Sequence, residues 1–526
     1  MSFPAGRMAL PFALFVFVTL LFAGLWFEVH SWETYMYASA TERFFSLAEF
    51  FSASQNGAPL PEVSDFHPYH PLFHLVVGSL VTLGKTFGAD SALVWAVILN
   101  KVAGLVALLF CHRVLRRIIV DDAAALLATA CVVSTKAFLF GSYSGEAHMV
   151  SFACFVVSLE RVLSIAKGDK DATGDVVVAA LWFSVGAAMN LAVFYYGVLL
   201  VGLLMVAGRR QQTLIGIGVA ALVLAVVYVA FPIVRLELSS FDEFRRLYSL
   251  YADLPRPRPS LWHWPAEFLD AVGQGMVPGT SGSSWLLRLG LAGALLIGLV
   301  GAPGASSRPG PPRWLIVWLL VFALGELVPR TESSINGTLY VALPLMGVLG
   351  CGLARLRDRP RLRLLSALLV VAFAVHNFSS VVLRKVSPPP EALPRLAHVR
   401  AKLPPDIPVA VVVGHMSLMQ EVYYLGHQLG VRDLTAFTPL TERSRQDLTT
   451  WFREHPRGCV LSSTPLRSHE FHELMRAVTP LDPEVYHYSV NHRDAHRVAQ
   501  KHVYLACRGA LSARTVSASS STTTTR

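Results

Sequence analysis

Long apolar runs alternate with short polar segments over the first 383 residues of the chain. A helix needs about 20 predominantly apolar residues to cross the roughly 30 Å hydrocarbon core of a bilayer. Eleven runs approach this length and predict membrane-spanning helices. They are 8–27, 93–115, 122–140, 148–166, 174–189, 191–207, 213–234, 284–302, 314–329, 338–354 and 363–383. As one helix, 174–207 would be about 50 Å long, so Asn190 near its middle is predicted to separate two short spans.

The segment 65–81, DFHPYHPLFHLVVGSLV, joins a stretch rich in histidine and proline to a short apolar run. If 70–84 crossed the membrane, the basic cluster 113–117 and every later basic cluster would face outside. Because Lys and Arg are enriched in cytoplasmic loops, the pattern predicts that 70–84 lies on the outer face without crossing. The N-terminus is then cytoplasmic, the C-terminus is extracytoplasmic, and the first outer loop covers 28–92.

The composition becomes that of a soluble protein from residue 388 onward. Short apolar and β-branched runs predict strands, and amphipathic runs predict helices. The predicted strands are 408–414, 458–463 and 502–507, and the predicted helices are 417–430 and 469–478. We therefore predict a transmembrane domain over 1–387, a small extracytoplasmic α/β domain over 388–512 and a disordered tail over 513–526.

Composition indicates a multi-pass membrane protein, for which we expect a location in a cell membrane of the bacterial inner or plasma type. The chain is 53% hydrophobic and 15% charged, whereas soluble proteins carry about 25% charged residues. Its net charge of +10 comes from clusters at predicted loop ends, which excludes a nucleic-acid-binding face. Cys459 and Cys507 fall in predicted strands, but a disulfide needs Cα atoms within about 7 Å of each other, so the sequence leaves their pairing open.

Acidic, basic and imidazole side chains gather at the predicted outer ends of the spans. They are Glu33, His67, His70, His74, Lys101, Glu146, His148 and Arg330. Ionisable groups at membrane depth usually face a cavity or a partner, so the pattern predicts a pocket at the outer surface. Simpler interpretations stay open: Glu33 as a solvated interface residue, Lys101 as a snorkelling side chain, and the histidines as interface residues. Pro68 and Pro71 interrupt the helical spacing that a histidine metal site would need.

Short motifs follow one another along the chain in a recognisable order. They are ETYMYA at 33–38, HPLFHLVVGSLVTLGKTFG at 70–88, RVLRRIIVDDAAALLATA at 113–130, GSYSGEAHM at 141–149 and INGTLYVALPLMGVL at 335–349. The series resembles the GT-C membrane glycosyltransferases that use polyprenyl-phosphate sugars. The branch with protein O-mannosyltransferases and lipid A aminoarabinose transferases is the most similar. In that branch an acidic motif follows the first span, then a juxtamembrane helix, then a span ending in a basic turn.

The resemblance implies a GT-C-like fold of about eleven transmembrane helices. Glu33 takes the position of the family's catalytic aspartate, and His70 takes that of a phosphate-binding lysine. Glu146 is one position away from where the family has a second acidic residue of the pocket. Together with the outer-face pattern, the resemblance predicts a group of substrate-binding side chains: Tyr37, His67, His70, Lys101, His148, Arg330 and Tyr340. The sequence specifies no cofactor and leaves a divalent metal open.

The implied reaction moves a sugar from a polyprenyl-phosphate donor to a lipid, glycan or protein acceptor at the extracytoplasmic face, with Glu33 as general base and Glu146 as the second catalytic residue. A polyprenyl phosphate is already a good leaving group, so one base can suffice, unlike the acid–base pair of glycosidases. Two alternatives stay open: a transporter or flippase for a lipid-linked or anionic substrate, and a non-enzymatic membrane scaffold.

Overall fold

The structure is a computed structural model of the full chain. The parts that it describes are 70–87, 92–143, 145–168, 172–235, 272–278, 282–300, 312–315, 317–319, 334–356, 360–383, 408–413, 434–437, 442–456, 458–463, 492–494, 497–499 and 503–507, with a few isolated positions. Two compact units meet in the sequence at Val386 and Ser387, and each is described by itself. The predicted first span and the full domain ranges extend over residues outside these parts and stay predictions.

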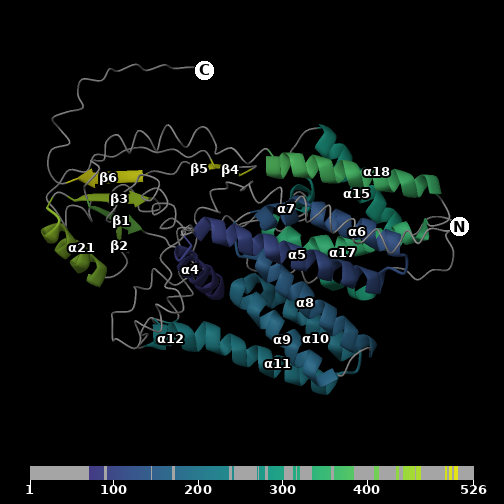
Figure 1. The fold of residues 1–526 in the computed structure, drawn as a ribbon, viewed down its shortest axis with the longest axis horizontal. Helices are drawn as coiled ribbons and strands as arrows, with labels where there is room; N and C mark the ends of the chain where they lie inside the picture. The colour runs from purple at the N-terminus through teal and green to yellow at the C-terminus, as the bar shows by residue number, and fades with distance from the viewer. Residues whose placement is uncertain are drawn as a thin grey trace, which may run out of the picture. The chain divides into compact units, whose positions relative to one another are not determined.

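Helices make up the first unit (Figure 1). In chain order they are α4 (Pro71–Lys85), α5 (Ala92–Ile118), α6 (Asp122–Ser134), α7 (Lys136–Tyr143), α8 (His148–Lys167), α9 (Ala172–Met189), η3 (Leu191–Tyr196), α10 (Gly197–Val206), α11 (Arg210–Ala225), η4 (Val226–Ala230), α12 (Phe231–Arg235), α15 (Gly282–Val300), α17 (Ser334–Arg355), α18 (Pro360–Phe378) and η5 (Ser379–Leu383). Helix α8 packs between α5 and α9, and α6 packs on α5, α17 and α18.

Several of these helices can cross a membrane. In the described part of the chain, five helical segments are long and apolar enough, or six if the bent pair α6–α7 counts as one span. The predicted spans 93–115 and 148–166 correspond closely to α5 and α8. Helix α9 and the segment η3–α10 are shorter apolar helices separated at Asn190, as predicted. The total of eleven spans stays a prediction.

Helices α6 and α7 meet at a 58° bend inside the predicted span 122–140. Thr135 has an extended backbone there, and its Oγ1 accepts a hydrogen bond from the Phe138 N–H at the start of α7. The Asn377 amide of α18 donates to the Ser134 and Met276 carbonyls, both at 2.7 Å. Non-helical backbone at membrane depth needs such internal partners. The hydrogen bond from Asn377 of α18 to the Ser134 carbonyl therefore stabilises the bend between α6 and α7.

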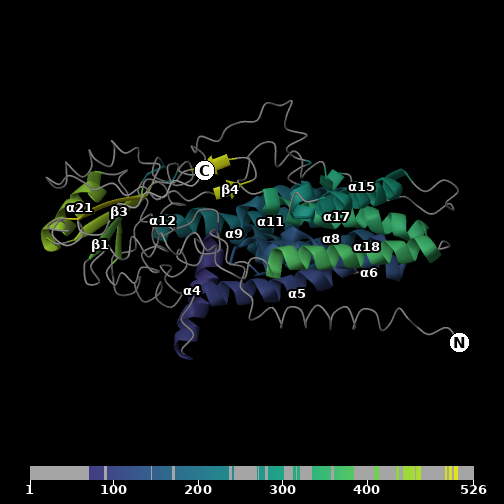
Figure 2. The ribbon, with the colours of Figure 1, turned by 90° about the horizontal axis from the view of Figure 1, so that it is seen from above.

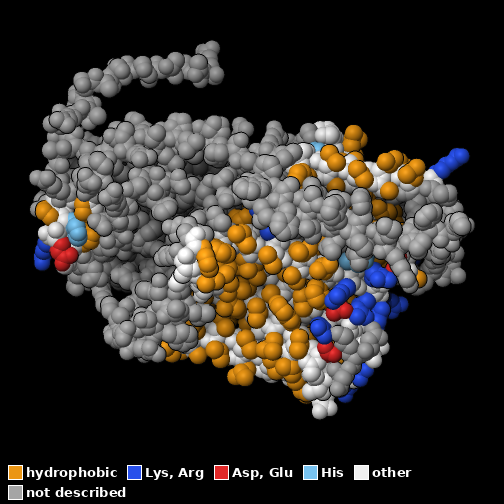
Figure 3. All heavy atoms as spheres, in the orientation of Figure 1, with side chains coloured by type: hydrophobic (Ala, Val, Ile, Leu, Met, Phe, Trp, Pro, Cys, Tyr) orange, Lys and Arg blue, Asp and Glu red, His pale blue; other side chains and the backbone are white. Residues whose placement is uncertain are grey.

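Basic side chains gather at one end of the helices (Figure 3). There Arg116 pairs with Asp122 at 2.9 Å and Arg117 with Glu160 at 2.8 Å, which ties the end of α5 to α6 and α8. Lys167 donates to the Arg117 carbonyl at 2.8 Å. Hydrophobic side chains cover much of the flank beside this end in the same view. The basic residues Arg116, Arg117 and Lys167, which the sequence assigns to the cytoplasmic side, thus lie together.

Helix α4 differs from the long helices in length and direction. Pro71 occupies its first turn, where the missing N–H leaves no hydrogen bond unmade. Its 15 residues extend for about 22 Å at about 1.5 Å per residue, which is short of a bilayer core of about 30 Å. Figure 2 shows α4 running across the direction of α5. These features agree with the prediction that α4 lies at the membrane surface and does not cross the bilayer.

We expect a cysteine at position 86, just after α4, to be accessible from outside the cell. Thr86 is exposed at the end of the helix, so Thr86→Cys should react with a membrane-impermeant thiol reagent on intact cells, as should Ser64→Cys and Ser462→Cys. Arg209→Cys, at the basic end, is the matched control and should react only after permeabilisation. Protection of position 86 in intact cells would show that 70–84 spans the membrane.

Strands form the core of the second unit. A four-stranded sheet has the order β2 (Leu434–Phe437), β1 (Val409–Val413), β3 (Cys459–Ser463), β6 (Val503–Cys507). Strand β1 runs parallel to β2 and β3, and β6 runs antiparallel to β3. Strands β4 (His492–Asp494) and β5 (Arg497–Ala499) form a separate antiparallel pair. Strands β1, β3 and β6 coincide with the three predicted strands, whereas the predicted helices 417–430 and 469–478 lie outside the described residues.

Helix α21 (Glu442–Glu454) and strand β2 are not among the elements predicted from the sequence. The helix buries Leu448, Trp451 and Phe452. These residues have the i, i+3, i+4 spacing of an amphipathic helix. The spacing was therefore present in the sequence, within a segment that is otherwise strongly polar.

Cys459 is disulfide-bonded, and the strand register sets it directly opposite Cys507 on β6. The other four of the six cysteines are free thiols, so we expect Cys507 to be the partner. Such a bond forms and persists in an oxidising compartment. Mass spectrometry of protein purified without reductant should recover the two cysteines as one cross-linked peptide pair. Recovery of both as free thiols would contradict the assignment.

Candidate active site

Five of the predicted site residues lie in the described part of the chain: His70, Lys101, Glu146, His148 and Tyr340. Glu33, Tyr37, His67 and Arg330 lie outside it. Three of the five, His70, Glu146 and His148, come together where α4 begins, where α8 begins and where α9 ends. Asn190 joins them, although the sequence suggested only a break between helices at that position.

Glu146 lies in the turn between α7 and α8, and its side chain is 1% exposed. Asn100 of α5 donates its amide N–H to the Glu146 carbonyl at 2.6 Å and so fixes the turn. The carboxylate oxygen Oε2 lies 3.8 Å from Nε2 of His148, the first residue of α8. Burial of an acid costs free energy unless polar groups compensate it. Buried ionisable groups in membrane proteins usually mark functional sites, so this turn is a candidate site.

Histidines 70 and 148 face each other across the start of α4. Their ring centroids are 6.1 Å apart in an edge-to-face arrangement. The end of α9 contacts both rings. Nδ1 of His70 lies 3.1 Å from the Met189 carbonyl, and Nδ1 of His148 lies 2.5 Å from the Asn190 amide nitrogen. These contacts join segments that are far apart in the sequence.

The protonation of His70 bears on the role that the family resemblance implies for it. Burial lowers the pKa of His70 to about 4, against the opposing effect of the hydrogen bond to the Met189 carbonyl. Since a carbonyl can only accept, His70 carries its proton on Nδ1 in the neutral form. At neutral pH His70 is thus uncharged, whereas a lysine at this position would be a cation. To bind phosphate as a cation, His70 would therefore have to become protonated.

Replacing His70 with glutamine should reduce the acid sensitivity of the fold. With a pKa near 4 in the folded state and about 6.5 in the unfolded state, stability is complete above pH 6.5 and falls as the pH drops toward 4. The loss attributable to His70 is about 2 kcal/mol near pH 5. Glutamine keeps a donor for the Met189 carbonyl but does not titrate. Thermal unfolding near pH 7.5 and pH 5 should show a smaller drop for His70→Gln than for wild type or His455→Gln. An equal drop in all three would contradict the assignment.

Lys101 and Tyr143 form a second contact beside the Glu146 turn. Lys101 is buried, with 5% exposure, and its Nζ lies 5.4 Å from the centroid of the Tyr143 ring at the end of α7. Attraction between a cation and an aromatic face strengthens when water is excluded. The burial of Lys101 argues against a side chain that merely reaches the surface.

Tyr340 of α17 lies deeper in the first unit. Its hydroxyl donates to Ser151 Oγ at 3.2 Å, and Ser151 donates to the Gly186 carbonyl at 2.7 Å. The Tyr340 ring stacks on Tyr196 with centroids 4.7 Å apart. Ser151 lies about one helical turn after His148 on α8, so the hydrogen bond from Tyr340 stabilises the first turns of α8. Substrate binding by Tyr340 stays a prediction.

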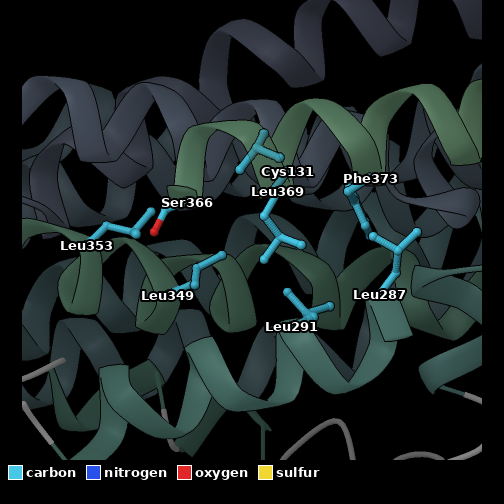
Figure 4. A pocket seen from close by; sticks show the side chains of 9 residues that line it. Cys131, Leu287, Leu291, Leu349, Leu353, Ser366, Leu369 and Phe373 are labelled. Carbon is cyan, nitrogen blue, oxygen red and sulfur yellow. The ribbon is translucent and has the colours of Figure 1, made fainter. Parts of the chain in front are cut away.

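A small apolar cleft lies between α6, α15, α17 and α18 (Figure 4). Its lining consists of Cys131, Leu287, Leu291, Leu349, Leu353, Ser366, Leu369, Val370 and Phe373. It shares no residue with the group around Glu146. Because it offers no acid, base or cation, it does not supply the polar groups that a transfer reaction needs.

In the described part of the chain, no group of three or more His, Cys, Asp or Glu side chains is arranged to hold a metal ion. Nδ1 of each histidine faces the end of α9, at Met189 or Asn190.

No family model and no curated protein matches the chain by sequence. Solved structures do match. ArnT from Cupriavidus metallidurans in the apo state has a TM-score of 0.57 and 14% identity, covering 94% of this chain and 98% of that chain. ArnT bound to undecaprenyl phosphate has a TM-score of 0.54 and 14% identity, covering 93% and 97%. The chain thus shares the fold of these ArnT structures, in agreement with the fold that the sequence resemblance predicted.

Proposed function

We propose that the protein is an integral-membrane glycosyltransferase that moves a sugar from a polyprenyl-phosphate donor to a lipid, glycan or protein acceptor at the extracytoplasmic face. The observation that carries the proposal is the buried group of Glu146, His148 and Asn190 within an ArnT-like fold. The ArnT structure with undecaprenyl phosphate supports a lipid-phosphate donor. The proposed orientation has a cytoplasmic N-terminus and an extracytoplasmic second unit.

Glu33 is the proposed general base. The acceptor hydroxyl gives its proton to the Glu33 carboxylate while the acceptor oxygen attacks the anomeric carbon of the sugar. The bond from that carbon to the phosphate oxygen breaks, and polyprenyl phosphate leaves with the electron pair. Because the leaving phosphate is already stable as an anion, no separate acid is required. General-base catalysis of this kind contributes about 10²–10⁴-fold.

Lys101 and Arg330 are the cations proposed to stabilise the departing phosphate. Of these two, only Lys101 lies in the described part of the chain. A buried cation beside a developing negative charge acts more strongly than the same cation in water. Glu146 is the proposed second acidic residue of the site, and His148 is its neighbour. Tyr37, His67 and Tyr340 are further proposed substrate-binding residues. The lipid tail of the donor stays in the bilayer between helices, which accounts for a polytopic fold.

A transporter or flippase is the alternative with a different chemistry. Transporter sites usually lie near the bilayer midplane at broken helices. Here the acid, the histidines and Asn190 lie at helix ends: the start of α4, the start of α8 and the end of α9. That position favours chemistry at the membrane surface. A scaffold would need none of these buried polar groups.

Proteoliposomes that contain a radiolabelled polyprenyl-phosphate sugar in both leaflets separate these functions. When a membrane extract supplies acceptors, a glycosyltransferase should transfer labelled sugar to them from donor in the extracytoplasmic leaflet and leave the donor in the other leaflet unchanged. A flippase should move intact donor between leaflets without releasing sugar. Translocation of intact donor with no transfer would overturn the proposal, and neither activity would favour a scaffold.

A further inference from the structure

The last residues of α9 contact both histidines of the candidate active site in different ways. The Met189 carbonyl faces Nδ1 of His70 at 3.1 Å, and the Asn190 side chain faces Nδ1 of His148 at 2.5 Å. A carbonyl can only accept a hydrogen bond, whereas an amide nitrogen can only donate one. The end of α9 therefore holds the two rings in opposite tautomers.

The orientation of the Asn190 amide follows from its second contact. Its Oδ1 accepts a hydrogen bond from the Ala192 N–H at 3.0 Å, as the N-cap of η3. The amide nitrogen must then face His148, which rules out the flipped arrangement. Nδ1 of His148 is thus the acceptor, and the proton of the neutral ring sits on Nε2.

That proton lies on the side of the ring that faces Glu146. Nε2 of His148 is 3.8 Å from Glu146 Oε2, which is an electrostatic contact rather than a full hydrogen bond. Contacts of this kind are often long without substrate and shorten when it binds. With the other tautomer, a ring lone pair would face the buried carboxylate and repel it.

We propose that Asn190 is a positioning residue that fixes His148 as the Nε2–H tautomer, so that the ring directs its N–H toward Glu146 and orients this buried acid. The inference rests on the proposed function, because Glu146 is the second acidic residue of that site. In this role Asn190 acts through its contact with His148. A neighbouring group that fixes a tautomer is a common requirement for histidines in active sites.

Asn190→Asp is the sharpest variant because it keeps the N-cap of η3. Aspartate caps helices as well as asparagine does, so the Ala192 N–H retains its acceptor and folding should survive. A carboxylate cannot donate to Nδ1 of His148 but can accept from it. His148 should therefore carry a proton on Nδ1 in the variant, either alone or together with Nε2.

Nitrogen-15 NMR of histidine-labelled protein in nanodiscs tests the tautomer directly, with His148→Gln identifying the His148 signals. We expect Nε2–H with unprotonated Nδ1 in wild type, and protonated Nδ1 in Asn190→Asp. A protonated Nδ1 in wild type, or an unchanged ring in the variant, would overturn the assignment. This readout does not depend on activity, so it stands even if the proposed function fails.

Kinetics then test the positioning role in protein with a known donor. Asn190→Asp should lower kcat by about 10–100-fold, the range measured for groups that orient metal-binding histidines and carboxylates, with little change in the KM for the donor. Normal kcat in a variant whose tautomer has changed would show that the contact is structural only. Loss of donor affinity at unchanged kcat would equally contradict the inference.

Discussion

Glu33→Gln is expected to lower sugar transfer by about 10²–10⁴-fold, the contribution of a positioned general base. Glutamine keeps the shape and the hydrogen-bonding capacity of the side chain but cannot take the proton of the acceptor hydroxyl. Folding and donor binding should therefore survive while turnover collapses. Steady-state transfer and donor affinity, measured on the same purified protein, separate the two effects.

Glu28→Gln is the matched control for this experiment. Glu28 lies five positions earlier in the same acidic stretch, FEVHSWE, and has no proposed role in the reaction. Its replacement should leave turnover within a few-fold of wild type. Near-normal turnover in Glu33→Gln would remove Glu33 from its role, and Glu146 would become the leading candidate for the base.

Lys101→Ala is expected to weaken donor binding by about 10–100-fold, since hydrogen bonds to charged groups contribute roughly 1.5–3 kcal/mol. Lys101 is buried beside Tyr143 next to the Glu146 turn, so its charge is shielded little by water. Lys101→Arg keeps the charge and should recover part of the affinity. The Kd for the polyprenyl phosphate, measured in nanodiscs, reports this loss without any need for turnover.

Val102→Ala controls for a general effect on α5. Val102 is the next residue and is 57% exposed, so its side chain points away from the Lys101 contact. Its replacement should leave the Kd unchanged. Equal Kd values for wild type and for a folded Lys101→Ala protein would show that Lys101 does not bind the lipid phosphate.

The helices of the first unit were largely predictable because each apolar run is long and bounded by charge. Helix α8 begins and ends within a residue of the predicted span, and α4 was correctly predicted as a helix that is short for a span. The bend between α6 and α7 was not predicted. The run 122–140 is apolar across the break, and the groups that satisfy the bend come from Asn377, more than 200 residues later.

The candidate site was only partly predictable for a similar reason. Glu146 and His148 were identified because they interrupt apolar sequence at a predicted outer turn. Asn190 was interpreted only as a break between helices, although its amide contacts a histidine 42 positions away. The neutral state of His70 arises from burial, and its proton is placed on Nδ1 by the Met189 carbonyl, 119 positions away. Neither contact leaves a pattern of spacing in the sequence.

The central claim is that this chain uses a polyprenyl-phosphate sugar as donor. Incubation of the purified protein with radiolabelled polyprenyl-phosphate sugars and a membrane extract that supplies acceptors tests it most directly. The account predicts that one donor is converted to polyprenyl phosphate, with an equal amount of label appearing in the acceptor, and that Glu33→Gln prevents both. Folded wild-type protein that consumes none of the donors, or Glu33→Gln protein that consumes them equally well, would contradict it.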